Sequence, residues 1–163
     1  MAGRGPGVRS LREIAAGGLI AGTIDVGAAC VINRLPPVVI LHAIASGVLG
    51  RASFQGGVRT AVLGLVLQWA MSLLIAGIFV IGATNVPLLR RRWLPAGLAY
   101  GVVIFFVMNY VVMPLSAVGR APAFTPAKIA GNMLAMLLFG AIVAFAARTR
   151  PAPSQAAAAE ERP

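Results

Sequence analysis

IAAGGLIAGTIDVGAACVIN, residues 14–33, combines an apolar run with a single acidic residue, and the chain is organised around it. Its 20 residues, at 1.5 Å of helical rise each, match a hydrocarbon core of about 30 Å and predict a transmembrane helix. Asp25 in its middle is the only acidic residue between Glu13 and Glu160. A charge there costs about 2.5 to 3.5 kcal/mol on insertion scales, so Asp25 should face protein or water and have a partner.

The composition places the whole chain in the membrane class. Hydrophobic residues make up 59% of the 163 residues, charged residues 11%, and the mean hydropathy is +0.88. The net charge of +10 could suggest nucleic acid, but the basic residues form short clusters between apolar runs, with no aromatic residues interleaved along a basic face. We therefore interpret them as topology determinants and lipid-headgroup contacts, and predict the lipid bilayer, not nucleic acid, as a partner.

Four apolar stretches are predicted to cross the membrane: residues 14–33, 60–82, 95–113 and 127–147. A further stretch, 38–49, has 12 residues and is too short to span, so we expect a re-entrant or interfacial half-helix. Residues 1–13 should be a cytoplasmic lead and residues 148–163 a disordered cytoplasmic tail. The predicted fold class is all-α, a four-helix transmembrane bundle with a half-helix between the first two spans.

Glycine, proline and helix-capping residues refine these boundaries. Residues 52–59, with Gly56 and Gly57, are predicted to be a flexible turn. Pro114 should kink or end the third helix, and Thr125 should cap the fourth.

The arginine distribution predicts the orientation. With four spans, the side of the termini holds nine basic residues and the other side five, so both termini should be cytoplasmic. The group Arg90, Arg91, Arg92 and Trp93 is predicted to anchor one interface, with its charges among the headgroups and the indole just below them.

Small residues predict where helices approach one another. Gly18 and Gly22 form one GxxxG pair, and Gly97 and Gly101 form a second. Such pairs let two backbones come close, so we expect these glycines to pack helices together within the chain or between copies of it. A homo-oligomer or another membrane protein is accordingly a candidate partner.

The polar residues of the spans are predicted to meet. Counted at 1.5 Å per residue, Asp25, Gln68 and Asn109 lie about 17, 18 and 21 Å from the cytoplasmic face. His42, the only histidine, could cap this cluster from the outer side.

Two hypotheses for this polar cluster stay open. In one, the polar groups specify helix packing, with Asp25 uncharged because a carboxylate is costly to desolvate. In the other, Asp25 is a proton or cation site in a small conduit, with His42 as a gate or relay. The packing hypothesis is favoured, because coupled transport usually needs more than one charged group within the membrane and this chain has a single acidic residue there.

The sequence offers little for catalysis. It has no HExxH motif, no paired carboxylates and no phosphate-binding glycine loop before a lysine. Ser46 follows His42 by four residues, which is also ordinary helix geometry, and the single Cys30 excludes a cysteine-based metal cluster. We predict a non-enzymatic protein without catalytic, cofactor-binding or metal-ligating residues.

Three segments, AGTIDVGAA (21–29), HAIASGVLGRASFQGG (42–57) and MNYVVMPLSAVG (108–119), resemble a group of small four-helix bacterial inner-membrane proteins, and more loosely the YagU-type membrane proteins. The resemblance covers roughly residues 14–147. It implies four spans and a bacterial inner membrane, and it implies no substrate. Members of this group often have Gln near the position of His42 and His near that of Gln68, so the departure here argues against an essential role for His42.

Overall fold

The computed structural model describes residues 6–119 and 125–148, and every regular element in those two ranges is a helix. The all-α prediction is confirmed. In chain order the elements are α1 (Pro6–Asn33), α2 (Pro37–Leu49), the 3-10 helix η1 (Gly50–Gln55), α3 (Gly57–Asn85), α4 (Pro87–Arg91), α5 (Trp93–Val107), the π-helical turn η2 (Met108–Val112), α6 (Met113–Leu115) and α7 (Pro126–Ala147).

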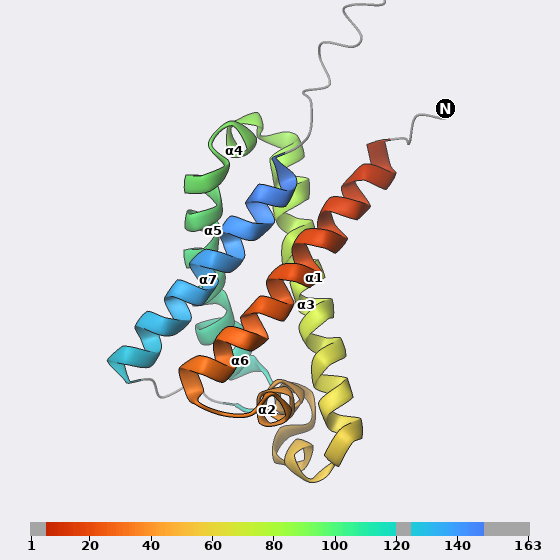
Figure 1. The fold of residues 1–163 in the computed structure, drawn as a ribbon, viewed down its shortest axis with the longest axis vertical. Coiled ribbons are helices and arrows are strands. Elements are labelled where there is room, and N and C mark those ends of the chain that lie inside the picture. Colours follow the sequence, from red (N-terminus) through yellow and green to blue (C-terminus); the bar gives the residue numbers. More distant parts are fainter. Residues whose placement is uncertain (1–5, 120–124, 149–163) are drawn as a thin grey trace, which may run out of the picture.

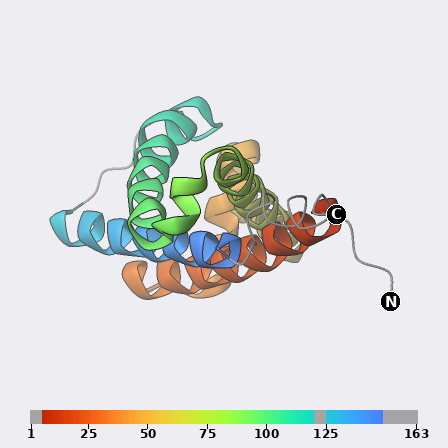
Figure 2. The ribbon, with the colours of Figure 1, turned by 90° about the horizontal axis from the view of Figure 1, so that it is seen from above.

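The long helices run lengthwise and α2 runs across them. Figure 1 shows α1, α3, α5 and α7 along the long axis in alternating directions, with α2 seen end-on at the lower end of the bundle. The start of α1 and the end of α7 lie together at the opposite end. Seen from above, α7 lies between α1 and α5 (Figure 2), and it packs against both of them, while α1 also packs against α3.

Five helical segments of the described chain, not four, are long and apolar enough to cross a membrane. They are Ile14–Asn33, Pro37–Gln55, Gly57–Asn85, Trp93–Leu115 and Pro126–Ala147. The additional one arises because α2 continues directly into η1, which lengthens the predicted half-helix to 19 residues. These segments make the protein a multi-pass membrane protein in contact with the lipid bilayer.

The prediction of a flexible turn over residues 52–59 was wrong, because η1 fills much of it. Ser53 is fully buried, and its hydroxyl donates to the carbonyl of Gly50 at 3.0 Å. The hydroxyl of Thr60 in turn donates to the carbonyl of Ser53 at 2.8 Å. These bonds tie the segment to the first turn of α3.

The connection from α1 to α2 has a defined helix ending. Arg34 adopts a left-handed φ of 53° directly after α1. The amide of Leu35 donates to the carbonyl of Cys30 at 3.1 Å and that of Arg34 to Val31 at 3.3 Å, the paired pattern that closes many helices. Pro37 then occupies the first turn of α2, where its missing amide hydrogen has no consequence.

The third span does not end at Met113, because the chain stays helical through Pro114 to Leu115. A proline has no amide hydrogen, and its ring collides with the carbonyl four residues earlier. The wide turn η2 directly before α6 accommodates this proline. At the start of the fourth helix, Thr125 is the N-cap residue, as predicted, although its side chain makes no capping hydrogen bond.

The termini agree only in part with the predicted boundaries. Helix α1 begins at Pro6, so much of the predicted lead of residues 1–13 is helical. Residues 1–5 of that lead and residues 149–163 of the predicted tail lie outside the described residues.

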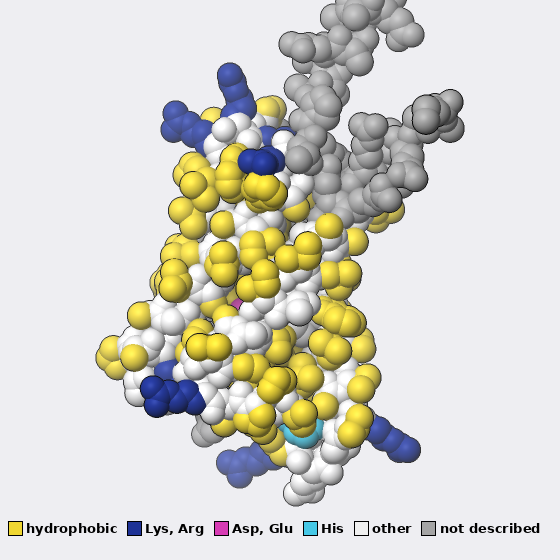
Figure 3. Space-filling view, viewed as in Figure 1, with side chains coloured by type: hydrophobic (Ala, Val, Ile, Leu, Met, Phe, Trp, Pro, Cys, Tyr) yellow, Lys and Arg dark blue, Asp and Glu magenta, His cyan; other side chains and the backbone are white. Residues whose placement is uncertain are grey.

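The outer surface is apolar between two basic ends. Large side chains such as Leu74, Ile78 and Leu134 are exposed on the long helices. Figure 3 shows hydrophobic side chains over the middle of the molecule, with Lys and Arg side chains at its upper and lower ends. This distribution is typical of helices that face lipid along their length and headgroups at their ends.

Candidate functional site

A polar pair joins α1 to α3 near the middle of the bundle. The side-chain amide of Gln68 donates to Oδ2 of Asp25, with Nε2 and Oδ2 3.0 Å apart. The same nitrogen lies 3.3 Å from the carbonyl oxygen of Gly22, to which it also donates. One amide group of α3 is thus bonded to both a side chain and the backbone of α1.

Glycines bring the two helices within reach of this pair. A Cβ added at Gly18 would lie 3.1 Å from the carbonyl oxygen of Ser72, and one added at Gly22 would lie 2.8 Å from the Cβ of Ser72. Both distances are shorter than ordinary side-chain contacts. Gly18 and Gly22 therefore pack α1 against α3 inside the chain, which places Asp25 one turn further along at the same contact.

A second polar contact lies beside the first and was not predicted. The indole of Trp69 donates to the hydroxyl of Thr23 at 3.3 Å, and that hydroxyl donates to the carbonyl of Leu19 at 2.8 Å. Both side chains are exposed on the outside of the bundle. Trp69 follows Gln68 in sequence, and Thr23 precedes Asp25 by two residues, so the inner and outer contacts stack at one crossing.

A small cavity adjoins the Asp25 and Gln68 pair. Its volume is about 30 Å³, room for one or two water molecules. All four long helical segments contribute to its wall, which contains Asp25, Gln68, Met71, Ser72, Ile75, Ile104, Met108, Met136 and Phe139. The carboxyl, amide and hydroxyl groups give a water molecule partners on one side, while apolar and methionine side chains close the other.

Asn109 does not join the pair. Its side-chain amide donates to the carbonyl of Phe105 in its own helix at 2.8 Å, and Met108, not Asn109, lines the cavity. Asn109 follows Gly97, Gly101 and Phe105 at steps of four residues, but this spacing does not keep it on their face of the helix. Twelve residues at about 100° each leave Asn109 about 120° around the helix from Gly97, away from the packed face.

His42 also lies elsewhere, at the end of the bundle where α2 meets α3. Its Nε2 donates to the carbonyl of Gly57 at 2.8 Å, and its ring packs edge-on against Phe54 with centroids 6.1 Å apart. Gly57 begins α3, so this bond is about 16 Å along the helix axis from Gln68. His42 therefore fastens α2 to α3 and does not cap the polar pair.

Ser46 makes no pair with His42 either. Its hydroxyl donates to the carbonyl of Ala43 in the same helix at 2.6 Å. Both side chains are buried, and each is bonded to backbone. Their spacing of four residues thus reflects the inner face of α2.

The second glycine pair packs α5 against α7. A Cβ at Gly97 would lie 2.7 Å from the carbonyl oxygen of Gly140, and one at Gly101 would lie 2.9 Å from the Cα of Leu137. A Cβ at Gly140 would lie 2.8 Å from the amide nitrogen of Gly101. These glycines are used within one chain, so they do not offer the predicted face for self-association.

The anchor residues gather at the end that holds the start of α1 and the end of α7. Arg90 and Arg91 lie in α4, Arg92 follows them, and Trp93 begins α5. The Trp93 ring packs edge-on against Phe145 at 5.5 Å, and the guanidinium of Arg148 lies 3.7 Å from the centroid of Phe145 and 5.2 Å from that of Trp93. An arginine over two rings suits a position between headgroups and hydrocarbon.

Within residues 6–119 and 125–148, no group of three or more His, Cys, Asp or Glu side chains is placed to hold a metal ion. Cys30 is a free, half-buried thiol. Comparison of the chain with protein-family profiles, curated proteins and solved structures gave no match. The resemblance to small four-helix inner-membrane proteins therefore stays a prediction.

Proposed function

We propose that the protein is a non-enzymatic, multi-pass membrane protein that serves as a packing or assembly partner within the bilayer. The Asp25 and Gln68 pair then fixes the crossing of α1 and α3, and it is not a transport site. The main support for this proposal is that the Gln68 amide donates both to the Asp25 carboxyl group and to the backbone of Gly22. The cavity beside these groups is only about 30 Å³. A conduit would need a row of waters or exchangeable groups leading away from Asp25.

The exposed side of the same crossing supports a partner surface. Thr23 and Gly27 lie one turn apart on the outer face of α1, and a Cβ at Gly27 would meet nothing within 4 Å. Small residues on a lipid-facing helix permit close approach of another helix. This open face, and not the occupied glycine pairs, is the proposed contact for a second copy or another membrane protein.

We further propose four membrane crossings in a bacterial inner membrane, with both termini cytoplasmic. The alternating directions of α1, α3, α5 and α7 support this count, because α2 both begins and ends at one end of the bundle (Figure 1). Val38, Val48 and Leu49 expose an apolar side of α2, as an interfacial or shallow re-entrant helix would. The larger number of arginines on the side of the termini supports the orientation.

A small proton or ion conduit is the second candidate, and the cavity beside Asp25 favours it. The cavity is lined in part by Met108, the first residue of a π-helical turn, and such turns occur often at functional sites. In this hypothesis η2 would widen to connect the cavity with one membrane face.

Two substitutions at Asp25 separate the candidates. Asp25→Asn keeps an oxygen that accepts from Gln68 but removes the ionisable group, whereas Asp25→Leu removes both. For a packing role, we expect Asn to preserve the stability of the purified protein in detergent and Leu to lower it by about 1 to 2 kcal/mol. Proteoliposomes with the unmodified protein should then show no proton or cation flux above empty liposomes. A flux that is lost in the well-folded Asp25→Asn variant would overturn the packing proposal in favour of the conduit.

A further inference from the structure

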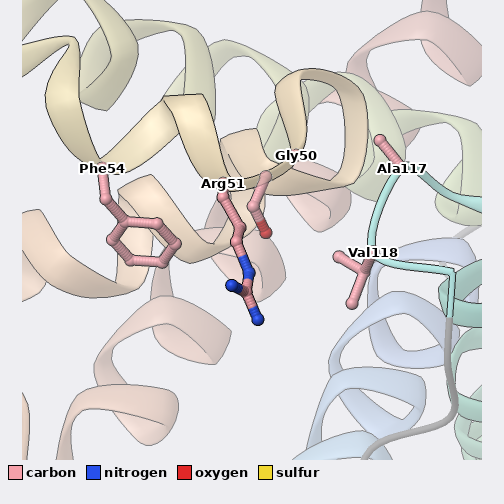
Figure 4. A pocket seen from close by; sticks show the side chains of 6 residues that line it. Gly50, Arg51, Phe54, Ala117 and Val118 are labelled. Atoms are coloured by element: carbon pink, nitrogen blue, oxygen red, sulfur yellow. The ribbon is translucent and has the colours of Figure 1, made fainter.

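A second, much larger hollow lies at the α2 end of the molecule. Its volume is about 540 Å³, within the range of small-molecule sites. Residues of α2, η1 and the segment that follows α6 line it: Ser46, Gly50, Arg51, Phe54, Ala117 and Val118. Figure 4 shows the Arg51 side chain extending into the space between Phe54 on one side and Ala117 and Val118 on the other.

The walls of this hollow are held together by backbone bonds. The amide of Ala117 donates to the carbonyl of Gly47 at 2.9 Å, which joins the segment after α6 to α2. Gly50, at the mouth of η1, has a φ of 59° that suits glycine and directs the chain away from α2. Its amide donates to the carbonyl of Ser46 and closes that helix. The two sides of the hollow are thus fixed relative to each other.

The charge inside the hollow is positive and has no acidic partner among the described side chains. Asp25, the only acidic side chain described, is bonded to Gln68 in the crossing of α1 and α3. Arg51 is exposed and carries the positive charge of an arginine side chain. Its planar guanidinium presents paired donors that match the oxygens of a phosphate group.

Apart from Ser46, the other side chains that line the hollow are apolar. Phe54 is 51% exposed, and Val118 and Ala117 form the opposite rim. The hollow lies at the end of the bundle where basic side chains follow the apolar belt (Figure 3), the level at which headgroups meet acyl chains. A ligand with one anionic group and attached hydrocarbon fits both parts of this lining.

We infer that this hollow is a binding site for the phosphate group of an anionic phospholipid. The guanidinium of Arg51 binds the phosphate oxygens. The Phe54 ring and the Val118 side chain contact the glycerol backbone and the first carbons of the acyl chains. We assign the phosphate group to a membrane lipid, because a free phosphate ion would make no contact with the apolar rim.

The test counts lipids bound to the full-length protein by native mass spectrometry after release from detergent. Phosphatidylglycerol is titrated against phosphatidylcholine, which carries a phosphate but no net charge. We expect a preference for phosphatidylglycerol that falls about 10-fold in Arg51→Gln. Arg59→Gln is the matched control, because Arg59 is exposed near the same end but does not line the hollow, and its preference should stay within about twofold of the unmodified protein.

A second variant tests the shape of the site without changing charge. Val118→Trp should fill part of the hollow and lower phosphatidylglycerol binding several-fold, with Arg51 intact. An equal loss in Arg51→Gln and Arg59→Gln would overturn the site in favour of general attraction to a basic surface. Equal competition by soluble glycerol phosphate at the same concentration would overturn the lipid as its source.

Discussion

Two helix crossings in this molecule start from the same sequence pattern and end in different chemistry. At α1 and α3, Gly18 and Gly22 face Ser72 and Leu73, and the Asp25 and Gln68 pair lies beside them. At α5 and α7, Gly97, Gly101 and Gly140 bring backbone against backbone. A GxxxG pair therefore predicts close approach, while the residues one turn further decide whether the contact is polar.

The difference shows how each contact obtains specificity in lipid. Hydrocarbon offers little hydrophobic drive for helix association, so close packing and hydrogen bonds must define the partner. At the glycines between α5 and α7 the fit is one of shape, and an added Cβ meets backbone of the facing helix that cannot move aside. The crossing of α1 and α3 combines a looser shape, in which Ser72 can adjust, with a directional bond. The first should be sensitive to volume and the second to polarity.

We expect the largest loss of stability from a methyl group added between α5 and α7. Gly140→Ala places a Cβ 2.8 Å from the amide nitrogen and 3.0 Å from the Cα of Gly101, so the helices must separate. We expect the free energy of unfolding, measured by SDS titration in mixed micelles, to fall by about 2 to 3 kcal/mol. Gly77→Ala is the control, because a Cβ there meets nothing within 4 Å, and it should change stability by less than about 0.5 kcal/mol. Equal effects at the two positions would contradict the backbone contact.

A smaller loss of stability is expected from added side-chain volume at the crossing of α1 and α3. Gly22→Ala meets the side chain of Ser72 and not backbone, with a Cβ-to-Cβ distance of 2.8 Å. We expect a loss of about 1 to 2 kcal/mol in the same assay. Ser72→Gly introduced together with Gly22→Ala should restore part of that loss, since it removes the obstructing atoms. If the double variant is no more stable than Gly22→Ala, then Ser72 is not the obstruction and the comparison between the crossings fails.

Polarity at the α1 and α3 crossing gives the third effect. Asp25→Leu and Gln68→Leu, made singly and together, form a double-mutant cycle on one hydrogen bond. We expect a coupling free energy of about 0.6 kcal/mol and no more than about 1.7 kcal/mol, the average and the maximum for hydrogen bonds between membrane helices. Zero coupling would mean that the pair adds nothing to the crossing.

The smallest effect belongs to the outer contact. Trp69→Phe removes the indole donor to Thr23 and keeps most of the apolar ring. Trp69 is 36% exposed, so we expect a loss below about 0.5 kcal/mol. Thermal unfolding in detergent, with Thr23→Val as the reciprocal change, measures it. A loss as large as that of Asp25→Leu would place the decisive bond outside the bundle.

Much of the fold could be predicted from local sequence, because membrane helices are encoded by long runs of apolar residues. The predicted spans 14–33, 60–82 and 127–147 each lie within a helix of the structure, and 38–49 lies within α2. The extra candidate span was missed because η1 contains Arg51, Ser53 and Gln55, which do not resemble a membrane segment. Its helical form depends on hydrogen bonds between side chains and backbone that no hydropathy pattern contains.

The candidate site could be predicted only over short distances along a helix. Four residues exceed one helical turn of 3.6 residues, so a face followed in steps of four drifts around the helix. Gln68 is one step of four residues from Gly64, a drift of about 40°, and it does face α1. Asn109 is three steps from Gly97, a drift of about 120°, and it turns to its own helix. The hollow beside Arg51 involves Ala117 and Val118, which are far from it in sequence, so only tertiary structure could reveal it.

The glycine contact between α5 and α7 has a consequence for entropy. Gly97, Gly101 and Gly140 have no side-chain rotamers to lose when the helices meet, whereas an ordered long side chain loses up to about 2 kcal/mol of conformational freedom. Within a preformed helix, the backbone freedom of these glycines has already been given up. Association of α5 with α7 at these glycines is therefore opposed by little loss of side-chain conformational entropy.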